Sequence, residues 1–283
     1  MGRRGVSLGW LRVSESRSGL PVCVLASLLA LAGCEEQPQH MGRKLSSWAH
    51  DLEAESAHKR RQAAEALGEM GGKAVKAHLQ TLVGLLDDVN QGVQMTAAEA
   101  LAKLPPEGTK ALVEQLQRPE PFQRMFAAAA LAEANPEHEK ALDTLVKTLS
   151  GVGNAELSKR AANHLVDLGE AAVPDLLAAL KTNYEPVRLK VIDTLGRIGE
   201  PAGTAVEPLA ALAADADEAV KLRTEALEAL AQIGPASKVA THMRALLEAP
   251  TEKVATVAAV LLKSIGARDS ATGYEGENKG DAK

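Results

Sequence analysis

Residues 188–199 read Arg-Leu-Lys-Val-Ile-Asp-Thr-Leu-Gly-Arg-Ile-Gly, and versions of this stretch recur along most of the 283-residue chain. Each version has an apolar anchor at the place of Leu195, and successive anchors lie 30 to 35 residues apart. The anchors are Leu67, Leu101, Leu131, Leu165, Leu195, Leu230 and Leu262. Self-similarity at a period of about 20–50 residues is the mark of a repeat array.

Each unit predicts a pair of helices. An Ala-rich segment comes first, and its apolar residues recur at helical spacing, as Leu195 and Ile198 do. A glycine such as Gly199 then ends the helix, where a left-handed residue is favoured. A second apolar helix follows, for example over 173–180 or 206–212. The sequence therefore predicts an array of helical hairpins.

This pattern resembles the HEAT repeat family, and specifically the short HEAT-like repeats of phycobilin lyases, over residues 45–266. The resemblance implies an all-α fold, a right-handed α-solenoid of about seven helix pairs. Apolar residues make up 46% of the chain and aromatic residues only 2%, so we expect a core of alanine and leucine. One helix pair buries too little area to offset its ordering entropy, so we expect one cooperative array rather than two globular domains.

The first 33 residues predict an export signal. Four arginines precede an apolar run over 20–32, and the run ends in Leu31-Ala32-Gly33-Cys34. This ending resembles the lipobox of bacterial lipoproteins, which implies cleavage before Cys34, a diacylglycerol on its thiol and acylation, for example by palmitate, of the new N-terminus. An uncleaved membrane anchor is the alternative, although the run is too short to span about 30 Å of hydrocarbon. Export by the twin-arginine route, through Arg3 and Arg4, is a second alternative.

These segments predict four parts of the chain. Residues 1–33 form a lipoprotein signal peptide, 34–44 the lipidated cysteine with a polar tether, 45–266 the solenoid and 267–283 a disordered tail. The lipoprotein resemblance implies a place in the cell envelope, facing the periplasm. Glu35, which is not aspartate, slightly favours the outer over the inner membrane. Of the two cysteines, Cys23 lies in the signal, so the mature chain has no free thiol.

The predicted array contains two pairs of apolar residues that include aromatic side chains. Trp48 and Leu52 lie four residues apart in a half-repeat, and we expect them to cap the open end of the first full unit. Phe122 and Phe126 also lie one helical turn apart. They either fill the core beside small alanines or form an exposed anchor on a binding surface.

Charge excludes one class of partner. The net charge of −5 becomes −8 without residues 1–33, which argues against nucleic-acid binding. Two positions of the unit carry charges that recur along the array, basic at one position and acidic at the other. Equivalent positions stack in a repeat array, so these ladders of side chains either pair between repeats or line a ligand groove. Seven residues before the anchors stand Arg60, Gln94, Arg124, Ser158, Arg188, Arg223 and Ala255. Two residues before them stand Glu65, Glu99, Ala129, Asn163, Asp193, Glu228 and Val260.

Motifs for catalysis are missing from the sequence. The seven histidines show no metal-ligand spacing, and there is neither a Gly-rich phosphate loop nor a nucleophile elbow. HEAT-repeat iron hydroxylases use four His-Glu pairs, whereas His138-Glu139 is a single pair. A phycobilin-lyase-like enzyme remains an alternative, but an exported, lipid-anchored chain is the wrong place for one. We therefore predict no catalytic residue, metal or cofactor.

The remaining prediction is a binding module. Solenoids present long surfaces that usually hold peptides or proteins, and we assign this surface to the polar positions of the second helices. The candidates are His78, Thr81, Lys110, Glu114, Asp143, Lys147, Asp175, Glu207, His242 and Arg244. The sequence thus predicts a membrane-tethered, periplasmic scaffold or adaptor for a protein or peptide whose identity it does not reveal. A structural spacer without a specific ligand is the alternative.

Overall fold

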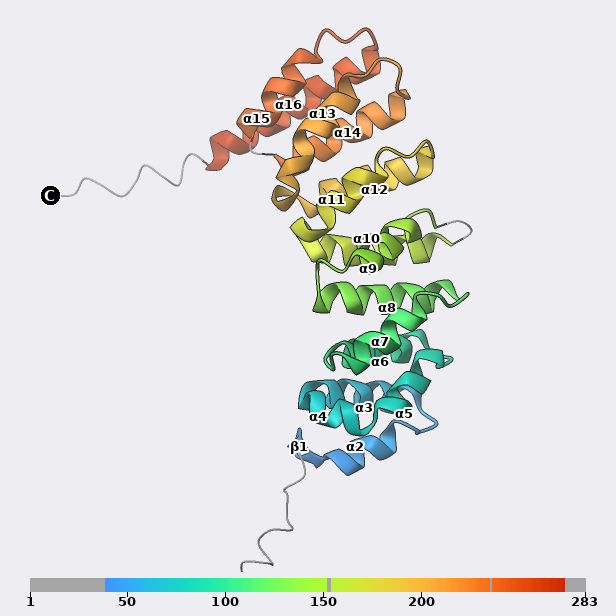
Figure 1. Cartoon of the computed structure of the whole chain (residues 1–283). Helices are drawn as coiled ribbons and strands as arrows, with labels where there is room; N and C mark the ends of the chain where they lie inside the picture. Colours follow the sequence, from blue (N-terminus) through green and yellow to red (C-terminus); the bar gives the residue numbers. More distant parts are fainter. Residues whose placement is uncertain (1–38, 152–153, 235, 273–283) are drawn as a thin grey trace, which may run out of the picture. The chain divides into compact units, whose positions relative to one another are not determined.

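A computed structural model describes the backbone over residues 39–151, 154–234 and 236–272, and the side chains over 39–151, 154–234 and 239–264. The predicted signal peptide, Cys34 and residues 273–283 of the predicted tail lie outside these ranges. Apart from one short hairpin, the described chain is helical, which confirms the predicted all-α solenoid (Figure 1).

The first helix of every unit is present, and each contains its anchor leucine. These helices are α3 (Ala57–Met70), α6 (Gln91–Ala102), α8 (Pro121–Ala134), α10 (Ala155–Leu168), α12 (Glu185–Ile198), α14 (Val220–Ile233) and α16 (Glu252–Thr272). Each contacts the next, so the first helices form one continuous layer.

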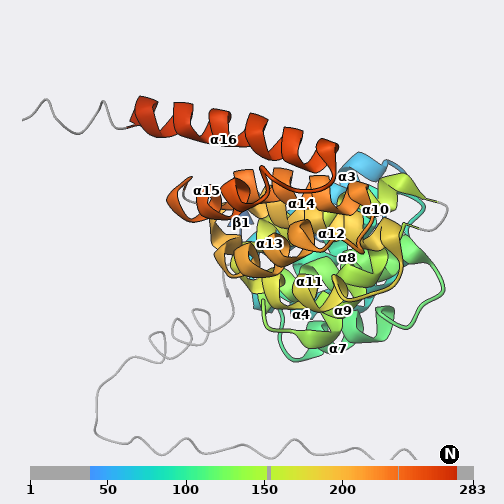
Figure 2. The ribbon, with the colours of Figure 1, turned by 90° about the horizontal axis from the view of Figure 1, so that it is seen from above.

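The second helices are shorter, and several are divided. They are α4 (Gly72–Ala77) with α5 (Leu79–Gly84) and η1 (Leu85–Asp87), α7 (Glu107–Gln115), α9 (Glu139–Thr148), η2 (Gly169–Ala172) with α11 (Val173–Ala179), η3 (Glu200–Ala205) with α13 (Val206–Ala214), and α15 (Ala236–Ala245). They pack against the first helices, and α9 also contacts α11. Within the described residues the array is therefore six helix pairs followed by α16, which packs beside α14 and α15 (Figure 2).

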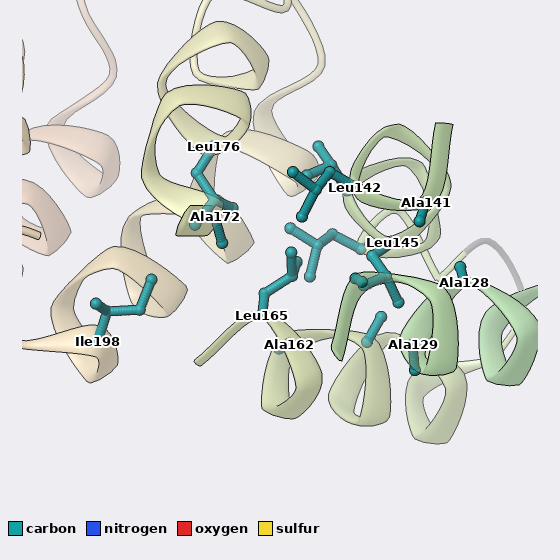
Figure 3. Close-up of a cluster of buried hydrophobic side chains, with 14 of the residues drawn as sticks. Ala128, Ala129, Ala141, Leu142, Leu145, Ala162, Leu165, Ala172, Leu176 and Ile198 are labelled. Atoms are coloured by element: carbon teal, nitrogen blue, oxygen red, sulfur yellow. The ribbon is translucent and has the colours of Figure 1, made fainter. Parts of the chain in front are cut away.

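The core is built from the predicted leucines and alanines. Leu195 and Leu165 are fully buried, whereas Leu262, at the end of the array, is only partly covered. Figure 3 shows Leu145 of α9, Leu165 of α10 and Leu176 of α11 meeting in one cluster, and all three are 0% exposed. The interior anchors lie between stacked units and are buried, whereas the anchor of the last helix is not, so burial depends on stacking.

A cap covers the first unit, as Trp48 and Leu52 predict. Trp48 lies on α2 (Leu45–Asp51), and both residues are buried. The sequence assigned residues 39–44 to an irregular tether, but they form an antiparallel hairpin of β1 (Gln39–His40) and β2 (Arg43–Lys44). The Arg43 guanidinium lies 3.7 Å from the Trp48 ring centroid, and Trp48 Nε1 donates a hydrogen bond to the His40 carbonyl. These contacts make the hairpin part of the cap.

Helix ends follow the predicted glycines in part. Gly169 and Gly199 end their helices with φ of 61° and 73°, the left-handed region that a glycine allows. Gly266 does not end its helix, because α16 continues to Thr272. The predicted boundary at 266 was therefore wrong. One interior glycine costs only about 1 kcal/mol relative to alanine, which the rest of a long helix can offset.

Phe122 and Phe126 fill the core, the first of the two predicted alternatives. Phe126 is buried and Phe122 packs against the core from its edge, with ring centroids 6.0 Å apart. Phe126 lies on α8 directly before a run of buried alanines, Ala127 to Ala130.

Candidate functional site

The predicted second-helix residues all lie at the surface or at its edge. Lys110, Glu114, Asp143, Lys147, Glu207 and Arg244 are exposed, while His78, Thr81, Asp175 and His242 are partly buried. His78 differs from the others because it lies at the break between α4 and α5 rather than within a helix. The face is therefore available over most of its length.

The structure brings only some of these residues together. Lys147 Nζ donates to Asp143 Oδ2 at 2.7 Å on α9. Burial raises the pKa of Asp175 on α11, and the nearby carboxylates of Asp143 and Glu139 raise it further. His242 Nε2 lies 3.3 Å from Glu207 Oε1, which joins α15 to α13. The ten residues thus form separate groups along the array rather than a single cluster.

Two surface grooves lie where the end of one second helix meets the side of the next. The first has a volume of about 420 Å³ and is lined by Leu116, Arg124, Asp143, Lys147 and Leu157 among others. The second, of about 490 Å³, is lined by Leu177, Leu180, Arg188, Leu212 and Glu218 among others.

These two grooves occupy equivalent places in the repeat. Leu116 and Leu180 each line one groove and lie 64 residues apart, which is two units. The same interval separates Arg124 from Arg188. The sequence named both arginines in the ladder for which a ligand groove was one of two explanations, but it did not predict that they lie beside the ends of the second helices.

The arginine position has a structural role that differs from the predicted ladder. Arg124 Nη1 donates to the carbonyls of Arg118 and Pro119, both at 2.6 Å. Arg223 Nε and Ser158 Oγ likewise donate to carbonyls ahead of their own helices. Within the described residues no ion pair joins this position to the position two before the anchors. Its side chains instead hold the loops between units.

Pairing between repeats does occur, but with acids in the loops. Arg60 Nε and Nη2 donate to the carboxylate of Asp88 at 2.6 and 2.8 Å. Arg188 Nη1 donates to Glu218 Oε2 at 2.8 Å. Burial raises the pKa of Asp88, but the hydrogen bonds from Arg60 and from the Asn90 backbone outweigh this effect, so that the pKa is lowered.

A third hollow, of about 470 Å³, lies on the first helices and is lined by Glu69, Glu99, Lys103 and Glu133 among others. Lys103 Nζ donates to Glu69 Oε1 at 3.0 Å. Burial raises the pKa of Glu99, and the charge of Glu133 adds to the effect. This acidic hollow lies outside the predicted second-helix surface.

Other predictions about chemistry can be placed only in part. Burial lowers the pKa of His164, a partly buried side chain of α10. Within the described ranges, no three His, Cys, Asp or Glu side chains are grouped so that they could hold a metal ion. None of the described helices is both long and apolar enough to cross a membrane. The predicted lipidation site, Cys34, lies outside the described residues.

Comparison with known families identifies the repeats. The family model for HEAT repeats matches residues 45–121, 142–222 and 173–263, which together cover more than half of the chain. A comparison with curated proteins gives no match.

Solved structures match the chain at low identity and with low TM-scores. An engineered protein is 24% identical with a TM-score of 0.30, over 79% of this chain and 96% of that one. Human deoxyhypusine hydroxylase is 21% identical with a TM-score of 0.37, over 88% and 92% of the two chains. The complex of CpcE and CpcF of phycocyanin lyase from Nostoc is 22% identical with a TM-score of 0.35, over 82% and 98%.

Proposed function

This chain belongs to the HEAT-repeat family, and on that premise we propose that it is a non-catalytic scaffold that binds a protein or peptide along its second helices. The observation that carries the proposal is the recurrence of the two grooves at equivalent places in the repeat. A surface that offers the same kind of hollow two units apart suits an elongated partner, since each unit adds contact area without a change of fold.

We further propose that a lipid on Cys34 tethers the scaffold to a membrane on its periplasmic side. The support is the sequence Leu31-Ala32-Gly33-Cys34 after the apolar run. From Cys34 the chain needs five residues to reach Gln39, where the capping hairpin begins. Such a segment spans at most about 18 Å when extended. The lipid would then hold the capped end of the array close to the membrane.

Site-specific photo-crosslinking tests the binding surface. A benzoylphenylalanine placed at Lys110, Lys147 or Arg244 in the native host should give covalent adducts with a partner, because these exposed positions lie on the second helices. Lys59 and Lys190 are matched controls, since both are exposed lysines on first helices and should give no adduct of the same mass. Adducts from both sets alike would refute the assignment of the face. A lack of adducts from every second-helix position would favour a structural spacer.

Metabolic labelling tests the anchor. Wild-type protein should incorporate radiolabelled palmitate and sediment with membranes, whereas Cys34→Ser should do neither, because the thiol is the lipid acceptor. Equal incorporation into the variant would exclude Cys34 as the lipidation site.

A further inference from the structure

The two equivalent grooves differ in how their arginine is neutralised. Arg188, in the second groove, is paired with Glu218, which follows it by 30 residues. Arg60, at the same position of an earlier unit, is paired with Asp88, 28 residues after it. In both cases the carboxylate comes from the loop that precedes the next first helix.

Arg124, in the first groove, has no such carboxylate among the described residues. The residue that follows it by 30 positions is Asn154, whose side-chain oxygen accepts a hydrogen bond from the Leu157 backbone. Arg124 Nη1 donates hydrogen bonds to two loop carbonyls, whereas its Nε and Nη2 make no hydrogen bond with the described residues. The arginine thus lines a groove with part of its donor capacity unused.

The other charges of this groove cancel. Asp143 and Lys147 both line it, and they form a pair with each other at 2.7 Å. The groove therefore carries one uncompensated positive charge, at Arg124, beside the apolar side chains of Leu116 and Leu157. A guanidinium favours a carboxylate because two parallel hydrogen bonds can form.

We propose that the first groove binds an acidic side chain of an extended partner segment, with the partner's carboxylate occupying the place that Asp88 and Glu218 hold in other units. This inference rests on the proposed scaffold function and names the chemistry of the partner. An apolar side chain next to the acid would lie on Leu116 and Leu157. The second groove, whose arginine is already neutralised, would accept an apolar side chain against Leu177 and Leu212.

The repeat sets the spacing of these two features in the partner. Packed helices lie about 8–10 Å apart, so grooves two units apart are separated by about 16–20 Å. An extended chain rises about 3.3 Å per residue, which places the second apolar residue about five or six residues from the acidic one.

A peptide-display experiment tests the inference on the full chain. A phage-displayed library of random linear peptides is selected on wild-type protein, and the enriched peptides are synthesised with a fluorescent label, together with versions in which Asp or Glu is replaced by Asn or Gln. We expect enrichment of peptides with an acidic residue beside an apolar one. Neutralising the acid should weaken binding at least about tenfold, as expected for the loss of a charge-assisted hydrogen bond.

Two variants connect this binding to the groove. Asn154→Asp keeps a good helix N-cap and puts a carboxylate 30 residues after Arg124, the same interval in sequence that separates Glu218 from Arg188. It should therefore weaken the acidic peptides at least about tenfold without a loss of stability. Arg124→Gln should weaken them similarly. Arg61→Gln, an equal change of charge at an exposed residue of α3, is the control and should bind as wild type does.

The outcomes separate this inference from the scaffold proposal. Selection of no peptide, selection without acidic residues, or equal binding to wild type and Asn154→Asp would overturn the assignment of the groove. If second-helix photo-crosslinks persist in that case, the scaffold function stands and only the partner chemistry is wrong. If acidic peptides bind as expected while crosslinks are absent in the native host, the groove is correct and the cellular role needs revision.

Discussion

Replacing Leu195 by alanine tests whether stacking of units stabilises the array. Leu195 is 0% exposed, and its helix α12 contacts α10, α11 and α14. The change removes three buried carbon atoms at about 0.8 kcal/mol each, or about 2.4 kcal/mol in transfer free energy. The cavity that remains adds to this, so we expect a loss of about 3–5 kcal/mol in the free energy of unfolding.

Leu262→Ala is a control at the same position of the repeat. Leu262 is only partly buried because no unit follows α16 in the described chain. Its replacement should therefore cost less, about 2 kcal/mol or below. Leu247→Ala, at a residue 43% exposed, should change the free energy by at most about 0.5 kcal/mol.

Urea unfolding followed by circular dichroism measures all three variants. Each should retain the helical signal of the wild type before the transition, with the midpoint lowest for Leu195→Ala. Leu195→Ala would refute the register of the repeat if its free energy of unfolding stayed within about 0.5 kcal/mol of the wild type. An equal cost for Leu195→Ala and Leu262→Ala would instead refute the role of the following unit.

Further predictions concern charge and close packing. Glu99→Gln should raise the melting temperature at pH 7 but not below pH 4.5, the ordinary pKa of a glutamate. Burial raises the pKa of Glu99, so the ionised carboxylate lowers the stability of the fold, and this cost is lost once the group is protonated in both the folded and the unfolded chain. Glu228→Gln, at an exposed residue in the same position of the repeat, should have little effect in parallel melts. Gly196→Val should lower the free energy of unfolding by about 1–3 kcal/mol in urea titrations, because even a Cβ at this position would approach the next first helix to 3.1 Å. Thr251→Asp should raise the free energy of unfolding by about 1 kcal/mol, because Arg223 is 2% exposed and its Nη1 donates to the neutral Thr251 hydroxyl at 3.2 Å. An unchanged urea midpoint would contradict this pairing.

The sequence by itself determined the fold class and the register of the units. The period of the anchor leucines predicts seven first helices, and the structure has a helix around each anchor. The second helices predicted at 173–180 and 206–212 were also correct, as was the cap at Trp48. This success has a physical reason. Every unit must bury the same face against its neighbours, so the same pattern of apolar residues recurs in each unit of the sequence.

Only the tertiary structure decided which polar side chains meet. Arg188 and Glu218 lie in different units, and so do Asp143 and Asp175, so helical periodicity within one unit does not show whether they are close. The hairpin over 39–44 and the continuation of α16 past Gly266 were likewise missed. Both depend on contacts or helix length that a local pattern does not contain. The grooves beside Arg124 and Arg188 arise for the same reason, since the walls of each come from segments that are separate in sequence and meet only when the units stack.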